Sequence, residues 1–136
     1  MNNCFILLAA GKGKRFNSKE KKQFINYKNK PLFMHSIDKA IKSNLFNKII
    51  LVTNKQIKIT NVNVIKGGKE RSDSSFKALK YLKNKKVKNV FIHDAARPNF
   101  SPTLPNDLIK AARDHDGSIP IIEASNTIKQ LNNEKL

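Results

Sequence analysis

The sequence has 136 residues, a length typical of one domain, and its 27 Lys and Arg against 10 Asp and Glu give a formal net charge of +17. Hydrophobic residues make up 39%, enough for one modest core, which argues against a disordered chain. The sequence has no apolar run near the ~20 residues of a membrane helix, no signal-peptide pattern, and only 1 cysteine, which excludes an internal disulfide. We therefore expect a cytoplasmic protein with one domain over residues 1–136.

The positive charge points to anionic ligands without deciding between them. Only four of the 27 basic residues are arginine, and the chain is rich in lysine, asparagine and isoleucine, as AT-rich coding sequences are. A basic surface attracts nucleic acid and charged nucleotides alike. The charge therefore indicates a preference for anions and no particular partner.

The first part of the chain predicts a buried strand and then a helix. The apolar run Cys4–Ala9 is typical of a strand covered on both faces. A glycine- and lysine-rich segment, Gly11–Lys22, follows it. Pro31 then opens a predicted helix. The apolar face of that helix comprises Phe33, Ile37, Ala40 and Ile41.

The middle of the chain predicts two strands and a second helix. Lys48–Thr53 and Val62–Ile65 are apolar runs, and a double glycine closes the second. Ser72 or Asp73 can cap the helix that comes next. The apolar side of this helix is formed by Phe76, Leu79 and Leu82.

The last part of the chain repeats the alternation. Asn89–His93 predicts another buried strand, and Asp107–Asp116 predicts a helix that Gly117 ends. Ser118–Ile122 and Thr127–Leu131 predict two further strands. The core side of the helix comprises Leu108, Ile109, Ala111 and Ala112.

Strands that alternate with helices of this length predict an α/β fold. Such βαβ units build a mainly parallel sheet with helices on both faces. In these sheets ligands bind beyond the carboxyl ends of the strands. The unusual residues of this chain follow strands, as that rule requires of a binding site.

The first such segment is the glycine turn after Ala9. Successive N–H groups in a turn of small residues form an anion-binding nest. The turn is neither a dinucleotide fingerprint nor a phosphate loop, because Phe16 replaces the third glycine and the lysine spacing differs. Arg15 and Lys22 can add positive charge for phosphate oxygens, although a flexible turn with surface lysines explains the bare pattern equally well.

Two further segments carry charged or polar residues at strand ends. Gly67–Ser74 combines a double glycine with a serine able to bond a sugar or a base. A turn followed by a helix cap explains Gly67, Ser72 and Asp73 but gives no reason for Glu70-Arg71. In His93–Pro98, Asp94 can hold magnesium or a ribose hydroxyl and Arg97 a phosphate. The alternative is an internal Asp94–Arg97 ion pair. The lone histidine of this segment is expected in the core, with no catalytic role.

These motifs together resemble one family. The strings L-A-A-G-x-G-x-R, K-Q-F, G-G-x-E-R-x-D-S and H-D-A-A-R-P occur in the order and spacing of 2-C-methyl-D-erythritol 4-phosphate cytidylyltransferase. The resemblance extends from Cys4 to about Lys129. It implies a Rossmann-like nucleotidyltransferase fold and transfer of CMP from CTP to methylerythritol phosphate, with release of pyrophosphate, in non-mevalonate isoprenoid biosynthesis.

The resemblance also implies roles for individual residues. The residues that it implies for CTP binding are Ala9, Ala10, Gly11, Gly68, Ser74, Asp94 and Ala95. The first three would act through their backbone, the next two at the cytosine, and the last two at the ribose and metal. Asp94 would also bind Mg2+, the implied cofactor.

Four further positions complete the implied site and mark where the chain departs from the family. Arg15 and Lys22 would stabilise the transition state, and Arg97 and Thr127 would hold the methylerythritol phosphate. Lys21, Lys69 and Asn126 stand where the family usually has proline, an acidic residue and aspartate. Family members continue past the length of this chain, which implies a domain incomplete at its C-terminus and a homodimer in the full-length form.

Three alternative functions stay open at this stage. A ribitol 5-phosphate cytidylyltransferase is the nearest, but members of that group tend to read L-A-G-G and H-D-S-V-R-P, unlike Ala10, Ala95 and Ala96. A non-catalytic fragment would keep the nucleotide fold with half of the site. A basic nucleic-acid-binding module would use the charge and have no use for Asp94, so nucleic acid is not the expected partner, and neither is a membrane.

Overall fold

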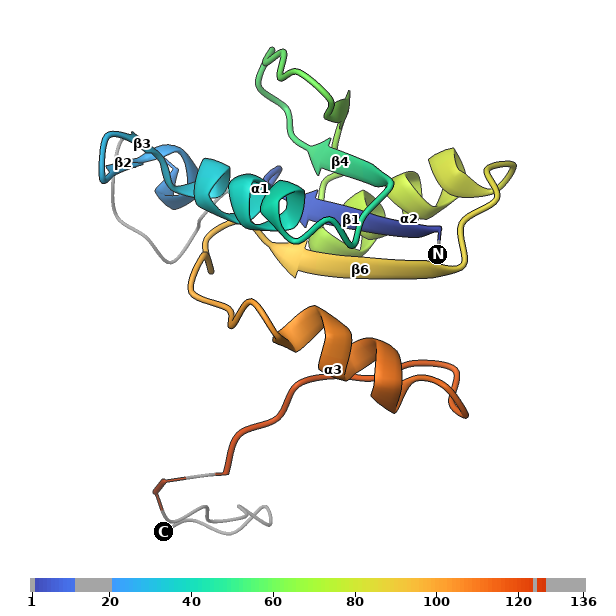
Figure 1. Cartoon of the computed structure of the whole chain (residues 1–136). Helices are drawn as coiled ribbons and strands as arrows, with labels where there is room; N and C mark the ends of the chain where they lie inside the picture. Colours follow the sequence, from blue (N-terminus) through green and yellow to red (C-terminus); the bar gives the residue numbers. More distant parts are fainter. Residues whose placement is uncertain (1, 12–20, 124, 127–136) are drawn as a thin grey trace, which may run out of the picture.

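Four parallel strands form the central sheet, in the order β5-β4-β1-β6 (Figure 1). The structure is a computed structural model that describes residues 2–11, 21–123 and 125–126. The strands are β1 (Asn3–Leu8), β4 (Lys48–Val52), β5 (Asn63–Ile65) and β6 (Asn89–Asp94). This arrangement confirms the predicted parallel α/β sheet, with the first strand at its centre.

Helices cover both faces of the sheet, as the sequence predicts (Figure 1). Helix α1 (Leu32–Lys42) packs over Phe5 and Leu7 of β1, and α2 (Arg71–Leu82) packs over the opposite face at Cys4 and Ile6. Because side chains alternate along a strand, β1 supplies both cores. No helix in the described part of the chain is long and apolar enough to cross a membrane.

A short hairpin precedes α1 and was not predicted. A 3-10 helix, η1 (Lys22–Phe24), leads into β2 (Asn26–Tyr27), which pairs antiparallel with β3 (Lys30–Pro31). The two turn residues have positive φ values, 47° at Lys28 and 65° at Asn29. Such a turn matches the twist of a two-residue hairpin, and asparagine tolerates it well.

The buried face of α2 differs from the prediction. Phe76 is 66% exposed and Leu79 is 43% exposed, so only Leu82 of the predicted apolar side reaches the core. The buried residues are Ser74, Ala78 and Leu82, spaced four apart. The small side chains of Ser74 and Ala78 let the helix backbone approach the sheet, and the larger Phe76 and Leu79 face solvent.

Two other details of the helices also correct the prediction. The residue that caps α2 is Glu70, and Asp73 instead accepts a hydrogen bond from the Glu70 N–H at 3.0 Å, as in a capping box. Ser72 is the second residue of the helix. In α1, Ile41 is 45% exposed. The buried residues of α1 are Phe33, Ser36, Ile37 and Ala40.

Strand β6 is not buried on both faces as predicted. It lies at the edge of the sheet that the described residues form, and its only strand partner there is β1. Val90 and Ile92 are 37% and 40% exposed, and they alternate with the half-buried Phe91. An edge strand covered on one face shows this alternation.

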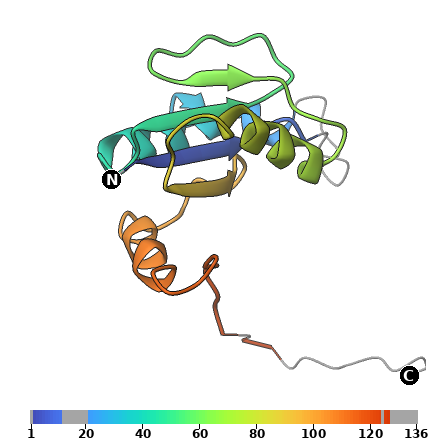
Figure 2. The same ribbon diagram turned by 90° about the vertical axis from the view of Figure 1, so that its right-hand side faces the viewer.

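The described residues after β6 form fewer regular elements than expected. Helix α3 (Leu104–Ala111) lies beyond the β6 edge (Figure 2), begins earlier than the predicted Asp107 and ends well before Gly117. Pro105 favours the early start because proline suits the first helical turn, and it is the one buried residue of this helix. The segment Ser118–Ile122 forms no strand, and its three isoleucines are at least 80% exposed. The predicted strand Thr127–Leu131 lies outside the described residues.

Candidate nucleotide site at the strand ends

The carboxyl ends of the central strands lie side by side and join the predicted site segments. The Ala95 N–H donates to the Leu8 carbonyl at 3.0 Å, and the Ala9 N–H donates to the Val52 carbonyl at 2.8 Å. These bonds carry the sheet ladder past the last strand residues. Ala9 and Ala95 are each 1% exposed, so both small residues are buried at this edge of the sheet.

The double glycine packs directly against the turn that follows β1. A Cβ added to Gly67 would lie 2.1 Å from the Ala10 Cβ and 3.1 Å from the Ser74 Oγ. A Cβ added to Gly68 would lie 2.1 Å from the Asp73 Cβ. Glycine is therefore required at both positions by close approach. The contact with Ala10 unites two segments that the sequence separates by more than fifty residues.

Ser74 fastens the double-glycine turn to the start of α2. Its hydroxyl accepts a hydrogen bond from the Gly68 N–H at 3.0 Å and donates one to the Glu70 carbonyl at 3.2 Å. The residue is 4% exposed. Lys77 adds a bond from Nζ to the Gly67 carbonyl at 2.9 Å. In the structure Ser74 thus orders the turn, and its predicted contact with the cytosine stays a prediction.

Asp94 lies between two guanidinium groups. Its Oδ1 is 2.9 Å from the Arg71 Nε, and its Oδ2 is 3.7 Å from the Arg97 Nε. The Asp94–Arg97 pair that the sequence left as an alternative is therefore present, and the shorter pair is with Arg71. Sequence reasoning assigned Arg71 no role, although a turn and a cap left it unexplained.

The charges at this edge favour an anionic ligand. The side chains of Arg71 and Arg97 are 63% and 80% exposed, so their donors can reach a ligand while they contact the Asp94 carboxylate. Two arginines against one carboxylate leave a local positive charge, and guanidinium groups bind phosphate oxygens with paired hydrogen bonds. Among the described residues no group of three His, Cys, Asp or Glu side chains could hold a metal ion.

The segment that carries Lys22 is attached to the same strand end. Gln23 donates from Nε2 to the carbonyl oxygens of Ala9 at 2.9 Å and Gly11 at 3.1 Å. Lys22 is exposed and immediately precedes this buried amide. The structure therefore brings Lys22 to the turn after β1. Arg15 and Thr127, the other predicted members of the site, lie outside the described residues.

His93 has a packing role next to the site. Its ring lies 5.9 Å from that of Phe5 and 4.8 Å from that of Phe100, measured between centroids. Its Nε2 is 2.7 Å from the Arg97 carbonyl oxygen, so the imidazole also orients the loop that carries Arg97. Burial lowers the pKa of His93, and the bond to Arg97 and the Asp94 charge oppose this shift. His93 is half-buried, so it lies at the margin of the core and not within it as the sequence predicts.

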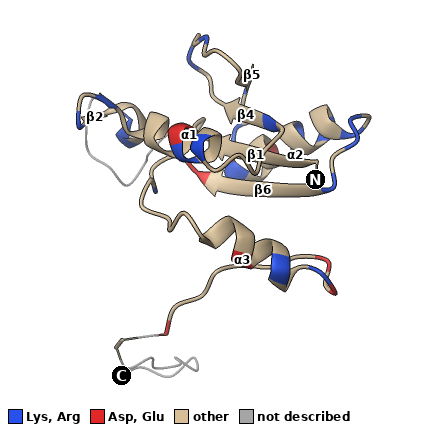
Figure 3. Cartoon of the chain, in the orientation of Figure 1, with Lys and Arg blue, Asp and Glu red and all other residues tan. Residues whose placement is uncertain are grey.

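The other basic residues are distributed over the molecule. Figure 3 shows Lys and Arg in the β2–β3 hairpin, on the helices and in the loops, with acidic residues on α1 and α3 and at the end of β6. Among the basic residues, Arg71 and Arg97 lie beside the Asp94 carboxylate at the strand ends.

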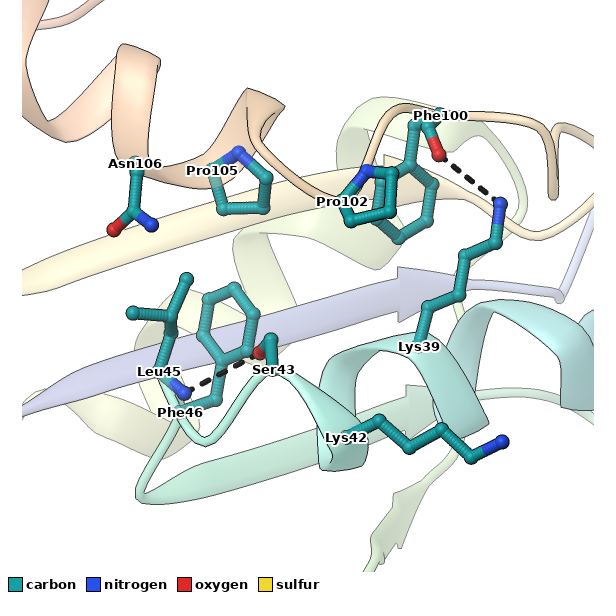
Figure 4. A pocket seen from close by; sticks show the side chains of 9 residues that line it. All are labelled: Lys39, Lys42, Ser43, Leu45, Phe46, Phe100, Pro102, Pro105 and Asn106. Atoms are coloured by element: carbon teal, nitrogen blue, oxygen red, sulfur yellow. Dashed lines mark hydrogen bonds between the residues drawn. The ribbon is translucent and has the colours of Figure 1, made fainter.

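A cavity of about 240 Å³ lies elsewhere, between the C-terminal half of α1 and the start of α3 (Figure 4). Leu45, Phe46 and Phe100 give it an apolar wall. Lys39 lines the cavity and donates from Nζ to the carbonyls of Pro98 at 2.7 Å and Phe100 at 3.0 Å. None of the predicted site residues that the structure describes lines this cavity, so it is separate from their strand-end site.

Comparison with known proteins agrees with the motifs. Residues 3–136 match the family model "IspD: 2-C-methyl-D-erythritol 4-phosphate cytidylyltransferase". A bifunctional enzyme IspD/IspF of Pelagibacter ubique is 52% identical over 96% of this chain and 37% of that protein. A 2-C-methyl-D-erythritol 4-phosphate cytidylyltransferase of Clostridium botulinum (strain Langeland) is 36% identical over 98% of this chain and 62% of that protein.

A solved structure gives the same relationship at the level of the fold. The 2-C-methyl-D-erythritol 4-phosphate cytidylyltransferase of Francisella tularensis superposes with a TM-score of 0.77 at 28% identity, over 98% of this chain and 63% of that one. The chain thus spans less than two thirds of the length of these relatives. Since the family model covers all but the first two residues, the chain belongs to the 2-C-methyl-D-erythritol 4-phosphate cytidylyltransferase family.

Proposed function

We propose that this chain transfers the CMP group of CTP to 2-C-methyl-D-erythritol 4-phosphate and releases pyrophosphate, as a step of non-mevalonate isoprenoid biosynthesis. Family membership supports the reaction. The single observation that carries it in the structure is the meeting of three strand ends, where Gly67 touches Ala10 and Arg71 pairs with Asp94. A triphosphate needs such a convergence of small residues and positive charge.

The small residues at this edge form the CTP-binding part of the proposed site. The backbone of Ala9, Ala10 and Gly11 passes close to the nucleotide, because small side chains allow the approach. The Ala9 N–H already donates to the Val52 carbonyl, so the donors to the nucleotide come from the turn beyond it. Gly68 and Ser74 bind the cytosine side. This assignment uses the turn that Ser74 orders through the Gly68 N–H.

Asp94 and Ala95 contact the ribose at the end of β6. A magnesium ion fits here only in company with the nucleotide, since Asp94 is a single carboxylate and Mg2+ takes one or two carboxylates together with phosphate oxygens and water. When bound, the ion would neutralise charge on the phosphates. Arg71 and Arg97 supply positive charge beside the same carboxylate.

The proposed chemistry is an in-line displacement without a covalent enzyme intermediate. A phosphate oxygen of methylerythritol phosphate attacks the α-phosphorus of CTP, and pyrophosphate leaves. Arg15 and Lys22 offset the negative charge that grows on the phosphate oxygens, so positioning and charge neutralisation lower the barrier. Arg97 and Thr127 hold the phosphate of the acceptor.

The domain and assembly assignments are proposals of the same kind. In the described residues a single four-stranded sheet carries a core on each face, which supports a single nucleotidyltransferase domain over residues 1–136. The family resemblance leads us to propose a homodimer in the full-length form. Light scattering on a full-length form measures its mass, and a monomer at micromolar concentration would contradict this assembly.

The decisive experiment measures pyrophosphate release by the purified chain with CTP, magnesium and methylerythritol phosphate. We expect turnover with methylerythritol phosphate and at least about tenfold lower kcat/KM with ribitol 5-phosphate, equivalent to about 1.4 kcal/mol of discrimination. The reverse preference would assign the sister activity. No release with either acceptor would overturn the proposed transfer and favour a non-catalytic nucleotide fold.

A further inference from the structure

Gln23 holds a buried amide against the strand end that the proposed site uses. The residue is 6% exposed, and its Nε2 donates to the carbonyl oxygens of Ala9 at 2.9 Å and Gly11 at 3.1 Å. Two carbonyl acceptors require the two N–H groups of an amide nitrogen. A carboxylate at this position would place its oxygen atoms against these carbonyl oxygens, and the like partial charges would repel each other. The chemistry of the contact therefore specifies glutamine.

These carbonyl groups lie just past the end of the sheet ladder. The register of β1 with its neighbours ends at Leu8, which pairs with Val52 on one side and Asp94 on the other. Beyond Leu8, the Gln23 side chain supplies the hydrogen-bond donors that a neighbouring strand would otherwise supply. The buried Ala9 carbonyl needs a hydrogen-bond partner, which the amide supplies, and the second bond to Gly11 fixes the direction of the turn.

The same short segment has a second anchor at Phe24. The ring of Phe24 meets that of Phe33 in α1 edge-on, with centroids 5.5 Å apart, and Phe24 is 7% exposed. The Phe24 N–H donates to the Lys21 carbonyl at 2.9 Å, which closes the turn of η1. Consecutive side chains thus attach η1 to the helix on one side and to the strand end on the other. Lys22 lies within this doubly anchored turn.

We propose that Gln23 is a positioning residue that sets the separation between Lys22 and the nucleotide-binding backbone of Ala9–Gly11. This inference rests on the proposed function and adds a determinant of its rate. Gln23 touches no reacting atom and acts through its neighbour. A misplacement of about 1 Å can lower an enzymatic rate by about 10²-fold, so loss of the amide should reduce turnover without removing any charge.

The first test replaces the amide by an isosteric apolar group. In Gln23→Met we expect kcat to fall by about 10- to 100-fold while KM for CTP changes by less than about threefold. The matched control is Asn3→Leu, which removes another buried amide, 1% exposed, whose Nδ2 donates to the Leu45 carbonyl at 2.9 Å near the opposite end of β1. This control should lower stability and leave kcat of the folded protein within about twofold.

The second test asks whether Gln23 acts through Lys22. In the Lys22→Ala background, Gln23→Met should lower kcat by less than about twofold, because the group that it positions is already absent. Equal effects of Gln23→Met in both backgrounds would overturn the proposal. If Gln23→Met does not fold, Gln23→Asn keeps the amide at a shorter reach and should lower kcat by about 3- to 10-fold.

Failure of this inference can be told apart from failure of the proposed function. If the wild-type chain releases pyrophosphate and both Gln23 variants match its kcat, the positioning role is wrong and the function stands. If the wild-type chain releases no pyrophosphate from CTP and methylerythritol phosphate, the proposed function fails, and the positioning role fails with it.

Discussion

The Arg71 guanidinium donates from Nε to the Asp94 Oδ1 at 2.9 Å and thereby joins the first residue of α2 to the last residue of β6. The two residues come from different strand-end segments. Their pairing leaves the second carboxylate oxygen facing Arg97 at 3.7 Å. The orientation of Asp94 thus depends on a residue in another part of the sequence.

Replacing Arg71 should weaken nucleotide binding more than it weakens the fold. The Arg71 side chain is 63% exposed, and exposed ion pairs contribute about 0–1 kcal/mol, so Arg71→Met should change the free energy of unfolding by less than about 1 kcal/mol. We expect KM for CTP to rise by about tenfold, because Asp94 loses its orientation and the site loses a cation. Urea unfolding and initial rates measure the two effects. Arg113→Met, at an exposed residue outside the site, is the control and should change neither.

Lys22→Ala should reduce turnover far more than affinity for CTP. A preorganised cation that stabilises developing charge typically contributes about 10²–10³-fold to kcat. We expect a fall of that size with less than about tenfold change in the CTP dissociation constant, measured by single-turnover kinetics and calorimetry. Lys110→Ala removes an exposed lysine of α3 and should behave as wild type. Near-normal turnover in Lys22→Ala would remove this residue from the mechanism.

Gly67→Ala should destabilise the protein and Gly117→Ala should not. The new methyl group at position 67 would lie 2.1 Å from the Ala10 Cβ, whereas nothing lies within 4 Å of the corresponding position at Gly117. Overpacking of this kind costs about 1–3 kcal/mol. Thermal and urea unfolding of both variants measure the difference. Equal stability of the two variants would mean that the turn after β5 is not in contact with the turn after β1.

Stability should decrease in mild acid because of His93. Burial lowers the pKa of His93 in the folded chain, so below its ordinary pKa of 6.5 the unfolded chain binds the proton more readily. The free energy of unfolding should therefore fall as the pH drops below about 6.5, until the folded pKa is passed. His93→Gln should flatten this slope, and the exposed His115→Gln should not. An unchanged slope in His93→Gln would contradict the lowered pKa.

Cys4 should be inert toward thiol reagents in the folded protein. The residue is fully buried, and burial raises the pKa of its thiol to about 11 against the opposing effect of Lys48. Since the thiolate is the reactive form, we expect no reaction with an aromatic disulfide reagent at pH 8 over minutes and complete reaction in guanidinium chloride. Rapid reaction without denaturant would show that β1 is accessible.

The alternation of elements could be predicted from the sequence, and the details of helix packing could not. Continuous apolar runs identify β1 and β4 because both faces of these strands are covered. Apolar periodicity fails in α2, where Ser74 and Ala78 face the sheet and Phe76 faces solvent. The choice between these faces depends on the distance between helix and sheet, which is not a local property of the sequence.

Some residues of the candidate site could likewise be predicted from the sequence, and others could not. Glycines, Asp94 and Lys22 could be placed near one sheet edge because each follows a strand in a parallel fold. Arg71 and Gln23 were not identified, since their roles come from partners distant in the chain: the Asp94 carboxylate for one and the carbonyls of Ala9 and Gly11 for the other. The unexplained Glu70-Arg71 pair was the one signal available for the first.

The contact between Ala10 and Gly67 means that the two turns share space for a single methyl group. An exchange that places glycine at position 10 and alanine at position 67 conserves this volume, while either enlargement alone does not. Any redesign of this sheet edge must therefore treat the two positions as one steric unit. A substitution in one turn therefore limits which side chains fit in the other.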